Sequence, residues 1–510
     1  MAPKVILINL PPALDCDFSS VGTVYPATGI LLIGSIMKIK GVSVQLIDCA
    51  LYKDYEQRVL AAIDGDTAMV CFSVMTSQVT MALNLSEKIK AKKNIISIVW
   101  GGIHTILFLQ QTVSNPNIDI AVTGDGVSTT ADLIDYLSGK INLKQIRGIG
   151  FKDAGGKIVI TDQSEPDDIN NIPYIDYSLL DNPETYLNAG SVYEREIKTD
   201  NGEKVRLMPV LTALGCCYKC RFCINSFLER KYRFKSAQSI VDEIKKLQKQ
   251  YNANAFLFLD EDFPVSKKRL LEFLELIEKE NLKFYWRIWG RVSYFHEKYI
   301  NRELVVRLEK NGLRSIAMGA ESGSQRTLDL IQKQIKTEDI LRSAKLLNNT
   351  KITARYSFIV GLEGEIKEDV KDTYALCVDL MDINPRVDIA GPFVFRYYPG
   401  SPLFENIVKN YNIKLPHKIE DWKDSLSDDG FLKMDEMPWL WDGFERSVAR
   451  ANKYVWIYES INKTHKLIGK LMKILIRWRI KNLYMEVPLE IYMFDMLVKF
   501  MNAVKKKELP

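Results

Sequence analysis

Four of the chain's eight cysteines stand close together, at positions 216, 217, 220 and 223. Thiolates are soft ligands that select iron–sulfur clusters, zinc or copper. A structural zinc site takes four closed ligands, usually as two spaced pairs, and the sequence offers no second pair. Cys216, Cys220 and Cys223, in C-x3-C-x2-C spacing, would instead ligate a 4Fe–4S cluster and leave one iron free to bind a reactant. Structural zinc remains the alternative, and Cys217 is interpreted as a bystander.

These cysteines follow the first of six apolar segments that alternate with helix-like stretches in the second half of the chain. Six strand–helix units in about 200 residues are typical of a whole or partial (β/α) barrel, whose chemistry lies at the carboxyl ends of its strands. A cluster-binding loop after the first strand would lie at that end. The predicted strands are residues 208–212, 255–259, 284–289, 315–319, 356–360 and 389–395.

The cysteine motif and the barrel together resemble the radical S-adenosylmethionine (radical SAM) superfamily, over roughly residues 205–405. The resemblance implies a partial (β/α)6 TIM barrel in which the free iron binds the amino and carboxylate groups of S-adenosylmethionine. An electron from the cluster then releases a 5′-deoxyadenosyl radical, which abstracts hydrogen from the substrate.

Elements similar to those of the superfamily recur at successive strand ends: LDEDF at 259–263, GAESGS at 319–324, FIVGLEGE at 358–365 and YYPGSPL at 397–403. Glu363 stands where a proline is more common. The resemblance implies contacts with S-adenosylmethionine from Phe222, Asp260, Asp262, Arg291, Glu321, Ser322, Ile359 and Tyr397.

The first part of the chain also alternates strands and helices. Its strands are continuously apolar, which indicates a parallel sheet covered by helices on both faces, a doubly wound Rossmann-like α/β domain. Ligands of such sheets bind in the loops at the carboxyl ends of the strands. The predicted strands are residues 5–10, 42–47, 68–74, 95–100 and 118–122.

This domain resembles the cobalamin-binding domain that precedes the barrel in many radical SAM enzymes, through residues 8–12, 25–29, 101–104 and 124–126. Asp125 stands where glutamate is common. No D-x-H-x-x-G motif occurs, so no histidine is expected to ligate cobalt from below. The resemblance implies cobalamin contacts from Pro11, Pro12, Ser73, Thr76, Gly101, Gly102, His104, Gly124 and Asp125.

Four parts of the chain are predicted. They are the cobalamin-binding domain (1–140), a linker (141–195) with a candidate hairpin at 146–161, the radical SAM core barrel (196–405), and an α-helical C-terminal domain (406–510).

Basic residues gather in the last part of the chain. Residues 442–510 contain 14 Lys or Arg against 7 Asp or Glu, whereas the whole chain has a net charge of only +5. Residues 463–481 combine these basic residues with apolar ones at helical spacing. We favour a helix packed on the barrel. Peripheral contact with an anionic membrane or a lipid-like substrate is the alternative. With neither an apolar span of about 18 residues nor a signal peptide, the predicted location is the cytoplasm.

The two resemblances together imply a cobalamin-dependent methyltransferase. A methyl group would pass from methylcobalamin to an unactivated carbon of a small molecule after hydrogen abstraction, and a flavodoxin or ferredoxin would supply electrons. Cyclisation, rearrangement or oxidation without net methyl transfer is the enzymatic alternative. A non-catalytic cobalamin or iron–sulfur sensor is less favoured, because no DNA-binding motif is evident. No acid–base or nucleophilic triad is predicted.

Overall fold

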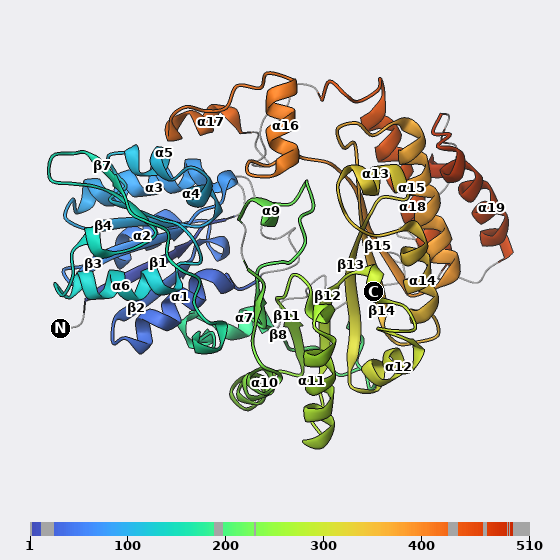
Figure 1. The fold of residues 1–510 in the computed structure, drawn as a ribbon, viewed down its shortest axis with the longest axis horizontal. Helices are drawn as coiled ribbons and strands as arrows, with labels where there is room; N and C mark the ends of the chain where they lie inside the picture. The colour runs from blue at the N-terminus through green and yellow to red at the C-terminus, as the bar shows by residue number, and fades with distance from the viewer. Residues whose placement is uncertain are drawn as a thin grey trace, which may run out of the picture.

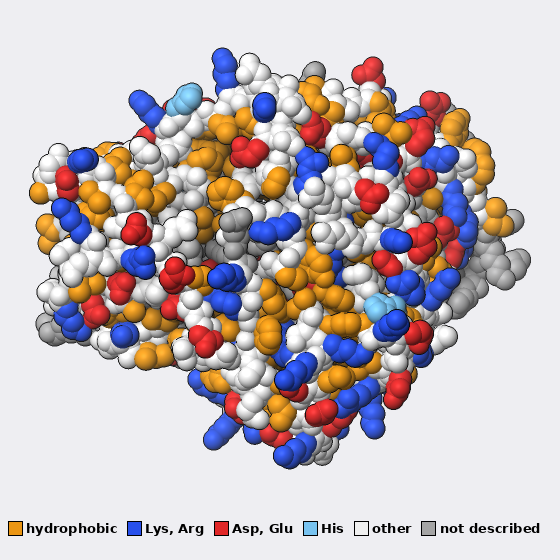
Figure 2. Space-filling model, in the orientation of Figure 1, with side chains coloured by type: hydrophobic (Ala, Val, Ile, Leu, Met, Phe, Trp, Pro, Cys, Tyr) orange, Lys and Arg blue, Asp and Glu red, His pale blue; other side chains and the backbone are white. Residues whose placement is uncertain are grey.

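The computed structural model describes residues 3–11, 25–187, 197–228, 231–426, 437–462, 467–486, 488 and 490–492. Pro12, one of the predicted cobalamin contacts, lies outside these residues. Two sheet-containing units lie side by side, and helices from the last part of the chain extend over both (Figure 1). On the face in Figure 2, basic and acidic side chains are interspersed, so this face has no large field of one sign.

The first unit is built on a seven-stranded sheet of order β2-β1-β3-β4-β5-β6-β7. The first five strands in that order are parallel, as predicted. The strand order reverses between β1 and β3, and ligands of doubly wound sheets bind near such a switch point. The strands are β1 (Lys4–Asn9), β2 (Ser43–Asp48), β3 (Thr67–Ser73), β4 (Ser97–Gly101), β5 (Ile120–Val122), β6 (Ile149–Lys152) and β7 (Ile158–Ile160).

Alternate residues of these strands face two separate apolar clusters. Val5 and Leu7 of β1 pack with buried residues of α1 and α6, whereas Ile6 and Ile8 pack with α2 and α3. Because successive side chains of a strand point to opposite faces, continuously apolar strands can be buried on both sides. The doubly wound fold is confirmed. The helices are α1 (Thr28–Ile39), α2 (Tyr55–Ala62), α3 (Val79–Lys92), α4 (Ile103–Leu107), α5 (Leu109–Ser114), α6 (Val127–Leu137) and α7 (Pro183–Leu187).

The predicted hairpin forms, but it belongs to the sheet and not to a linker. β6 pairs antiparallel with β5, and β7 pairs with β6. Ile149 and Phe151 are buried in the core of the first unit, which is why the hairpin adds to the edge of the sheet. The first unit therefore extends past residue 140, to at least residue 160. The other domain boundaries stay predictions.

The second unit contains a six-stranded parallel sheet of order β15-β14-β13-β12-β11-β8. All six predicted strands are present, and no pairing between β8 and β15 closes the sheet among the described residues, as expected of a partial barrel. The strands are β8 (Leu207–Val210), β11 (Ala255–Phe258), β12 (Tyr285–Gly290), β13 (Leu313–Glu321), β14 (Thr353–Val360) and β15 (Val387–Val394).

The helices of the barrel have buried apolar faces and local caps. In α10, the Ser236 side chain accepts a hydrogen bond from the amide of Ser239, and Asn252 ends the helix in the left-handed conformation. A short hairpin of β9 (Ala213–Leu214) and β10 (Arg233–Phe234) precedes it. The helices are α9 (Asn225–Leu228), α10 (Ala237–Tyr251), α11 (Lys267–Lys279), α12 (Arg302–Lys310), α13 (Gln325–Leu330), α14 (Thr337–Leu347) and α15 (Lys367–Ile383).

The last part of the chain is helical, with α16 (Pro402–Asn410), α17 (Trp422–Ser425), α18 (Phe444–Asn462) and α19 (Leu467–Asn482). Arg477 of α19 pairs with Asp379 and Asp382 of α15, and Lys473 and Lys481 pair with the same two carboxylates. The basic face of α19 thus packs on the barrel, which agrees with the interpretation we favoured. No described helix is both long and apolar enough to cross a membrane.

Candidate site for two cofactors

The three predicted cluster ligands lie on the loop between β9 and α9. Cys220 is buried, Cys216 and Cys223 are partly buried, and Cys217 is exposed. The loop is anchored through Arg221, whose amide donates to the carbonyl of Ile331 at 3.0 Å and whose guanidinium donates to that of Leu330 at 3.1 Å. The cysteines are therefore held against the carboxyl ends of the barrel strands.

This donor set fits a cluster better than a single ion. Among the described residues, no three His, Cys, Asp or Glu side chains are arranged around a position for one metal ion. A cubane cluster instead receives each thiolate on a different iron. Burial raises the pKa of Cys216 to about 11 and also raises that of Cys223.

A chain of polar contacts joins the cysteine loop to the ends of β11 and β12. Asp262 accepts a hydrogen bond from the Tyr294 hydroxyl at 2.7 Å, and that hydroxyl lies 2.9 Å from the hydroxyl of Tyr218, inside the cysteine motif. The Arg291 guanidinium lies 3.6 Å from the centre of the Tyr218 ring. Asp262 is buried, and its Oδ1 has no hydrogen-bond partner within the part of the chain that is described. Such an oxygen fits the ammonium group of an amino-acid ligand, as the resemblance implies for S-adenosylmethionine.

Glu321 ends β13 with a positive φ of 62°. Its side chain folds back over Gly319, where an added Cβ would lie only 2.1 Å from the Glu321 carboxylate. Lys333 pairs with Glu321 at 2.7 Å, and its ammonium lies 5.9 Å from the centre of the Phe222 ring. Arg291 also donates to the Lys333 carbonyl. The ends of β12 and β13 therefore meet beside the cysteine loop.

An apolar surface completes this side of the site. Phe222, Ile359 and Tyr397 belong to one cluster with buried residues of α16, although they come from three distant segments. A cluster of this kind suits the flat face of an adenine ring. Six of the eight predicted S-adenosylmethionine contacts thus lie in these two adjoining groups: Phe222, Asp262, Arg291, Glu321, Ile359 and Tyr397.

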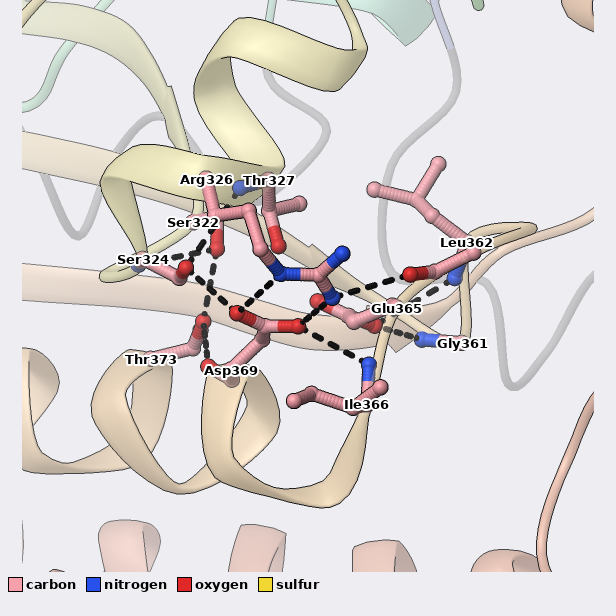
Figure 3. A network of polar contacts seen from close by, with 11 residues as sticks. Ser322, Ser324, Arg326, Thr327, Gly361, Leu362, Glu365, Ile366, Asp369 and Thr373 are labelled. Carbon is pink, nitrogen blue, oxygen red and sulfur yellow. Dashed lines mark hydrogen bonds and ion pairs between the residues drawn. The ribbon is translucent and has the colours of Figure 1, made fainter.

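The other two predicted contacts brace the structure. Asp260 forms a buried ion pair with Arg269 at 2.6 Å. The Ser322 hydroxyl lies 2.9 Å from that of Thr373 on α15, and Figure 3 shows the two side chains pointing toward each other. Direct contact of Asp260 or Ser322 with S-adenosylmethionine stays a prediction.

Tyr218, Tyr294 and Lys333 were missed by the sequence analysis. Tyr218 stands inside the cysteine motif, and its position there could have suggested a role. Tyr294 and Lys333 follow no recognisable pattern, because their side chains reach the site only through the packing of the barrel.

A second site lies at the carboxyl ends of β3, β4 and β5. A cavity of about 520 Å3 opens there, within the usual size of a cofactor pocket. Apolar side chains of α1 and α6, such as Ile33 and Leu133, form part of its wall. Gly102 has a φ of 96°, and an added Cβ would approach the Val74 amide nitrogen to 2.6 Å, so only glycine allows this turn. Five of the predicted cobalamin contacts line the cavity: Ser73, Gly101, Gly102, Gly124 and Asp125.

The remaining described candidates lie outside the cavity. The Pro11 carbonyl accepts a hydrogen bond from Gln78 at 3.1 Å. His104 is fully buried, 3.3 Å from the Thr76 hydroxyl, with its ring against Phe108 and Trp422. Burial lowers the pKa of His104 to about 3. A cobalamin contact from His104 stays a prediction, and this placement favours a packing role instead.

The cavity reaches the barrel. Leu211, Leu214 and Leu259 of the second unit complete its wall. Leu214 stands two residues before Cys216, and Leu259 directly precedes Asp260. The two sites therefore adjoin across the contact between the units.

Comparison with known proteins agrees with this division. The B12 binding domain family matches residues 15–134, and the Radical SAM superfamily matches residues 210–377. An uncharacterised methyltransferase of Pyrococcus horikoshii is 28% identical over 438 residues, which cover 84% of this chain and 88% of that protein. The anaerobic magnesium-protoporphyrin IX monomethyl ester cyclase of Rubrivivax gelatinosus is 29% identical over 61% of this chain, and the match spans only 53% of the cyclase.

A solved structure shares the whole fold. OxsB, described as a cobalamin-dependent S-adenosylmethionine radical enzyme with aqua-cobalamin and S-adenosylmethionine bound, matches all of this chain with a TM-score of 0.70, at 16% identity and over 82% of OxsB. The chain therefore carries a B12 binding domain ahead of a Radical SAM domain, and these two domains imply cobalamin, a 4Fe–4S cluster and S-adenosylmethionine as its cofactors.

Proposed function

We propose that this enzyme transfers a methyl group to an unreactive carbon of a small molecule. The observation that carries the proposal is the shared wall of the two sites. The cavity of the first unit is lined by Leu214 and Leu259, which adjoin the cysteine loop and the Asp262 turn in sequence. A substrate bound at this contact could present one carbon to both cofactors.

The chain's own residues would bind and orient the reactants. When bound, cobalamin carries a methyl group, and the cluster supplies the electron that cleaves S-adenosylmethionine. Cys216, Cys220 and Cys223 would hold the cluster, and Asp262 would accept the ammonium group of S-adenosylmethionine. The apolar wall formed by residues such as Leu214 would exclude water from the reacting carbon.

The relatives support methyl transfer first and cyclisation second. The methyltransferase from P. horikoshii is similar along most of both chains. The cyclase match is of similar identity but leaves almost half of the cyclase uncovered. Ring closure without net methyl transfer is therefore our second candidate, since it would use the same two sites.

We further place the reaction in the cytoplasm, with a flavodoxin or ferredoxin as the electron donor. All seven described cysteines are free thiols, as a reducing compartment would keep them. A lipid-like substrate is not favoured, because three basic side chains of α19, those of Lys473, Arg477 and Lys481, pair with α15.

Anaerobic reconstitution with trideuteromethyl-labelled S-adenosylmethionine, a chemical reductant and small-molecule extracts tests the proposal. Methyl transfer predicts both S-adenosylhomocysteine and 5′-deoxyadenosine, together with a product that carries the labelled methyl group. Cys220→Ala is the matched control and should yield no 5′-deoxyadenosine. Formation of 5′-deoxyadenosine alone would favour cyclisation, and formation of neither compound would defeat both candidates.

A further inference from the structure

An ion pair crosses the contact between the two units. Arg233 of β10 pairs with Asp125 in the turn that lines the first unit's cavity, and each side chain is only 15% exposed. Arg233 also donates to the Asp167 carbonyl at 2.6 Å. The Asp167 carboxylate accepts from the amide of Ser128, in the first turn of α6, at 3.0 Å. Arg233 therefore contacts both the cavity turn and the segment that binds the start of α6.

The same arginine is tied to the cluster loop through its backbone. Arg233 pairs in register with Leu214 of β9, two residues before Cys216. A further backbone hydrogen bond holds the two strands together, since the Lys235 amide donates to the Thr212 carbonyl at 2.9 Å. Arg269, the buried partner of Asp260, donates to that same carbonyl at 3.1 Å.

The contacts of Arg233 thus span the route between the cofactor sites. The side chain of Arg233 holds the cavity turn. Its backbone pairs with β9, the strand that directly precedes the cysteine motif. A partly buried charge pair is weakly screened and prefers a narrow geometry. A neighbouring polar contact, from the Ser236 amide to the Asn170 side chain at 3.1 Å, does not involve the cavity turn.

We propose that Asp125 and Arg233 form a positioning pair that sets the distance between the cobalamin and the cluster. Asp125 then acts through Arg233 and not as a direct contact to cobalamin, the role implied by resemblance. The inference rests on the presence of both cofactors and is independent of whether the reaction is methyl transfer or cyclisation.

The test uses the full chain reconstituted with both cofactors. Pulsed electron paramagnetic resonance gives the distance distribution between Co(II) and the reduced cluster, while iron content and cobalamin affinity are measured in parallel. The variants are Arg233→Gln, Asp125→Arg and the charge swap Asp125→Arg with Arg233→Asp. Arg314→Gln is the matched control, because it removes another buried arginine that pairs with an aspartate, Asp200, at 2.7 Å and lies at the start of β13.

Arg233→Gln and Asp125→Arg should broaden or shift the distance distribution. In Arg233→Gln, iron content and cobalamin affinity should stay within about twofold of the native values. The charge swap should restore a narrow distribution, and Arg314→Gln should leave it unchanged. An unchanged distribution in Arg233→Gln would overturn the inference. So would a cobalamin affinity at least about tenfold weaker in Asp125→Arg with no change in distance, which would show direct contact.

If Arg233→Gln does not fold, the charge swap decides. A folded swap variant with the native distance supports the pair, and a swap variant that also fails to fold overturns it. The distance measurement does not depend on turnover. It can therefore be interpreted even if the activity assay yields no S-adenosylhomocysteine.

Discussion

Asp260 and Asp262 stand one residue apart after β11, yet their partners give them different roles. Asp260 is neutralised by Arg269, which is also fully buried. Asp262 receives only the Tyr294 hydroxyl and keeps one oxygen without a partner among the described residues, and burial raises its pKa to about 7. Oδ1 of both carboxylates lacks a hydrogen-bond partner among the described residues, so the difference between them is one of charge. The Asp260 carboxylate is already paired with a guanidinium, whereas that of Asp262 can receive a ligand's ammonium group.

The cysteines give the sharpest prediction for single residues. Alanine at Cys216, Cys220 or Cys223 should lower iron and sulfide per chain by more than about tenfold, since even outer-shell partners of a metal site contribute that much. Cys217→Ala is the control and should retain the cluster, because its thiol is exposed. Loss of iron in Cys217→Ala together with retention in Cys216→Ala would move the ligand by one position.

Glu365 predicts a pH dependence of stability. It is buried, it accepts hydrogen bonds from the amides of Gly361 and Leu362, and its Oε1 has no partner within the described part of the chain (Figure 3). Burial raises its pKa from 4.5 to about 8. Between these values the unfolded chain has lost the proton and the folded chain keeps it, so stability falls as the pH rises through this window.

Glu365→Gln should remove this pH-dependent loss of stability. The glutamine side chain stays neutral, and its carbonyl oxygen can still accept hydrogen bonds from the Gly361 and Leu362 amides. Relative to the native chain, the variant should gain thermal stability as the pH rises from about 5 to 8, with an upper bound on the order of 4 kcal/mol. Glu363→Gln is the control, since this partly exposed carboxylate accepts a hydrogen bond from the side chain of Asn410. Equal unfolding temperatures of the native chain and Glu365→Gln at every pH would contradict this assignment.

At the scale of elements, α15 holds two strand ends in place. Its Asp369 accepts from Ser324 at 2.6 Å and from the Ile366 amide at 2.8 Å, and it pairs with Arg326 (Figure 3). Ser324 follows the β13 end that carries Glu321, and Arg326 also donates to the Gly364 carbonyl in the loop after β14. One carboxylate thus couples two loops of the predicted S-adenosylmethionine site.

Asp369→Ala should therefore weaken S-adenosylmethionine binding about tenfold and cost about 2–3 kcal/mol of stability, since it leaves buried donors without acceptors. Iron content should not change, because the cysteine loop is anchored at the carbonyls of Leu330 and Ile331, at the opposite end of α13 from Ser324. Equilibrium dialysis of the reconstituted enzyme measures the affinity. Glu368→Ala, an exposed position beside it, is the control, and native affinity in Asp369→Ala would refute the coupling.

The packing of α19 predicts how the chain behaves toward membranes. Lys473, Arg477 and Lys481 are paired with Asp379 and Asp382, although Ile474, Leu475 and Trp478 are exposed. Paired cations attract an anionic surface weakly, so the chain should not sediment with anionic vesicles. Sedimentation that Trp478→Glu abolishes, and that Trp456→Glu on α18 does not, would restore the membrane alternative.

At the scale of the whole molecule, a segment of the C-terminal part closes over the first unit (Figure 1). Trp422 of α17 is fully buried there, its indole donates to Gln111 at 2.7 Å, and Glu420 accepts from Asn115 at 2.6 Å. Ile419 and Leu426 belong to the same core cluster as β1 and β3. The chain therefore returns to its first unit after completing the barrel.

Trp422→Ala should detach this segment. The cavity left beside His104 and Phe108 is expected to cost about 3–5 kcal/mol. Scanning calorimetry should then show the first unit melting at a lower temperature, with the barrel transition unchanged. Lys423→Ala, at an exposed neighbouring position, is the control. A single unshifted transition in Trp422→Ala would contradict this coupling.

Long apolar strands could be predicted from the sequence. Very short strands, and the sheet that a hairpin joins, could not. All six barrel strands and the five parallel strands of the first sheet follow from continuous apolar runs. The β9–β10 hairpin was missed because strands of two residues carry no periodicity. The β6–β7 hairpin was recognised but placed in a linker, because local pattern does not reveal which sheet edge a hairpin joins.

The amino-acid sequence by itself determined the cofactor chemistry and the order of the domains. Cys216, Cys220 and Cys223 form one contiguous motif, and the strand-end elements recur in chain order, so both can be read along the chain. The tertiary structure alone decided which side chains these residues pair or pack with. Asp260 forms an ion pair with Arg269, His104 packs against Trp422, and Asp125 forms an ion pair with Arg233. Each partner is distant or unpatterned in sequence, and such pairs form only when folding brings their elements into contact.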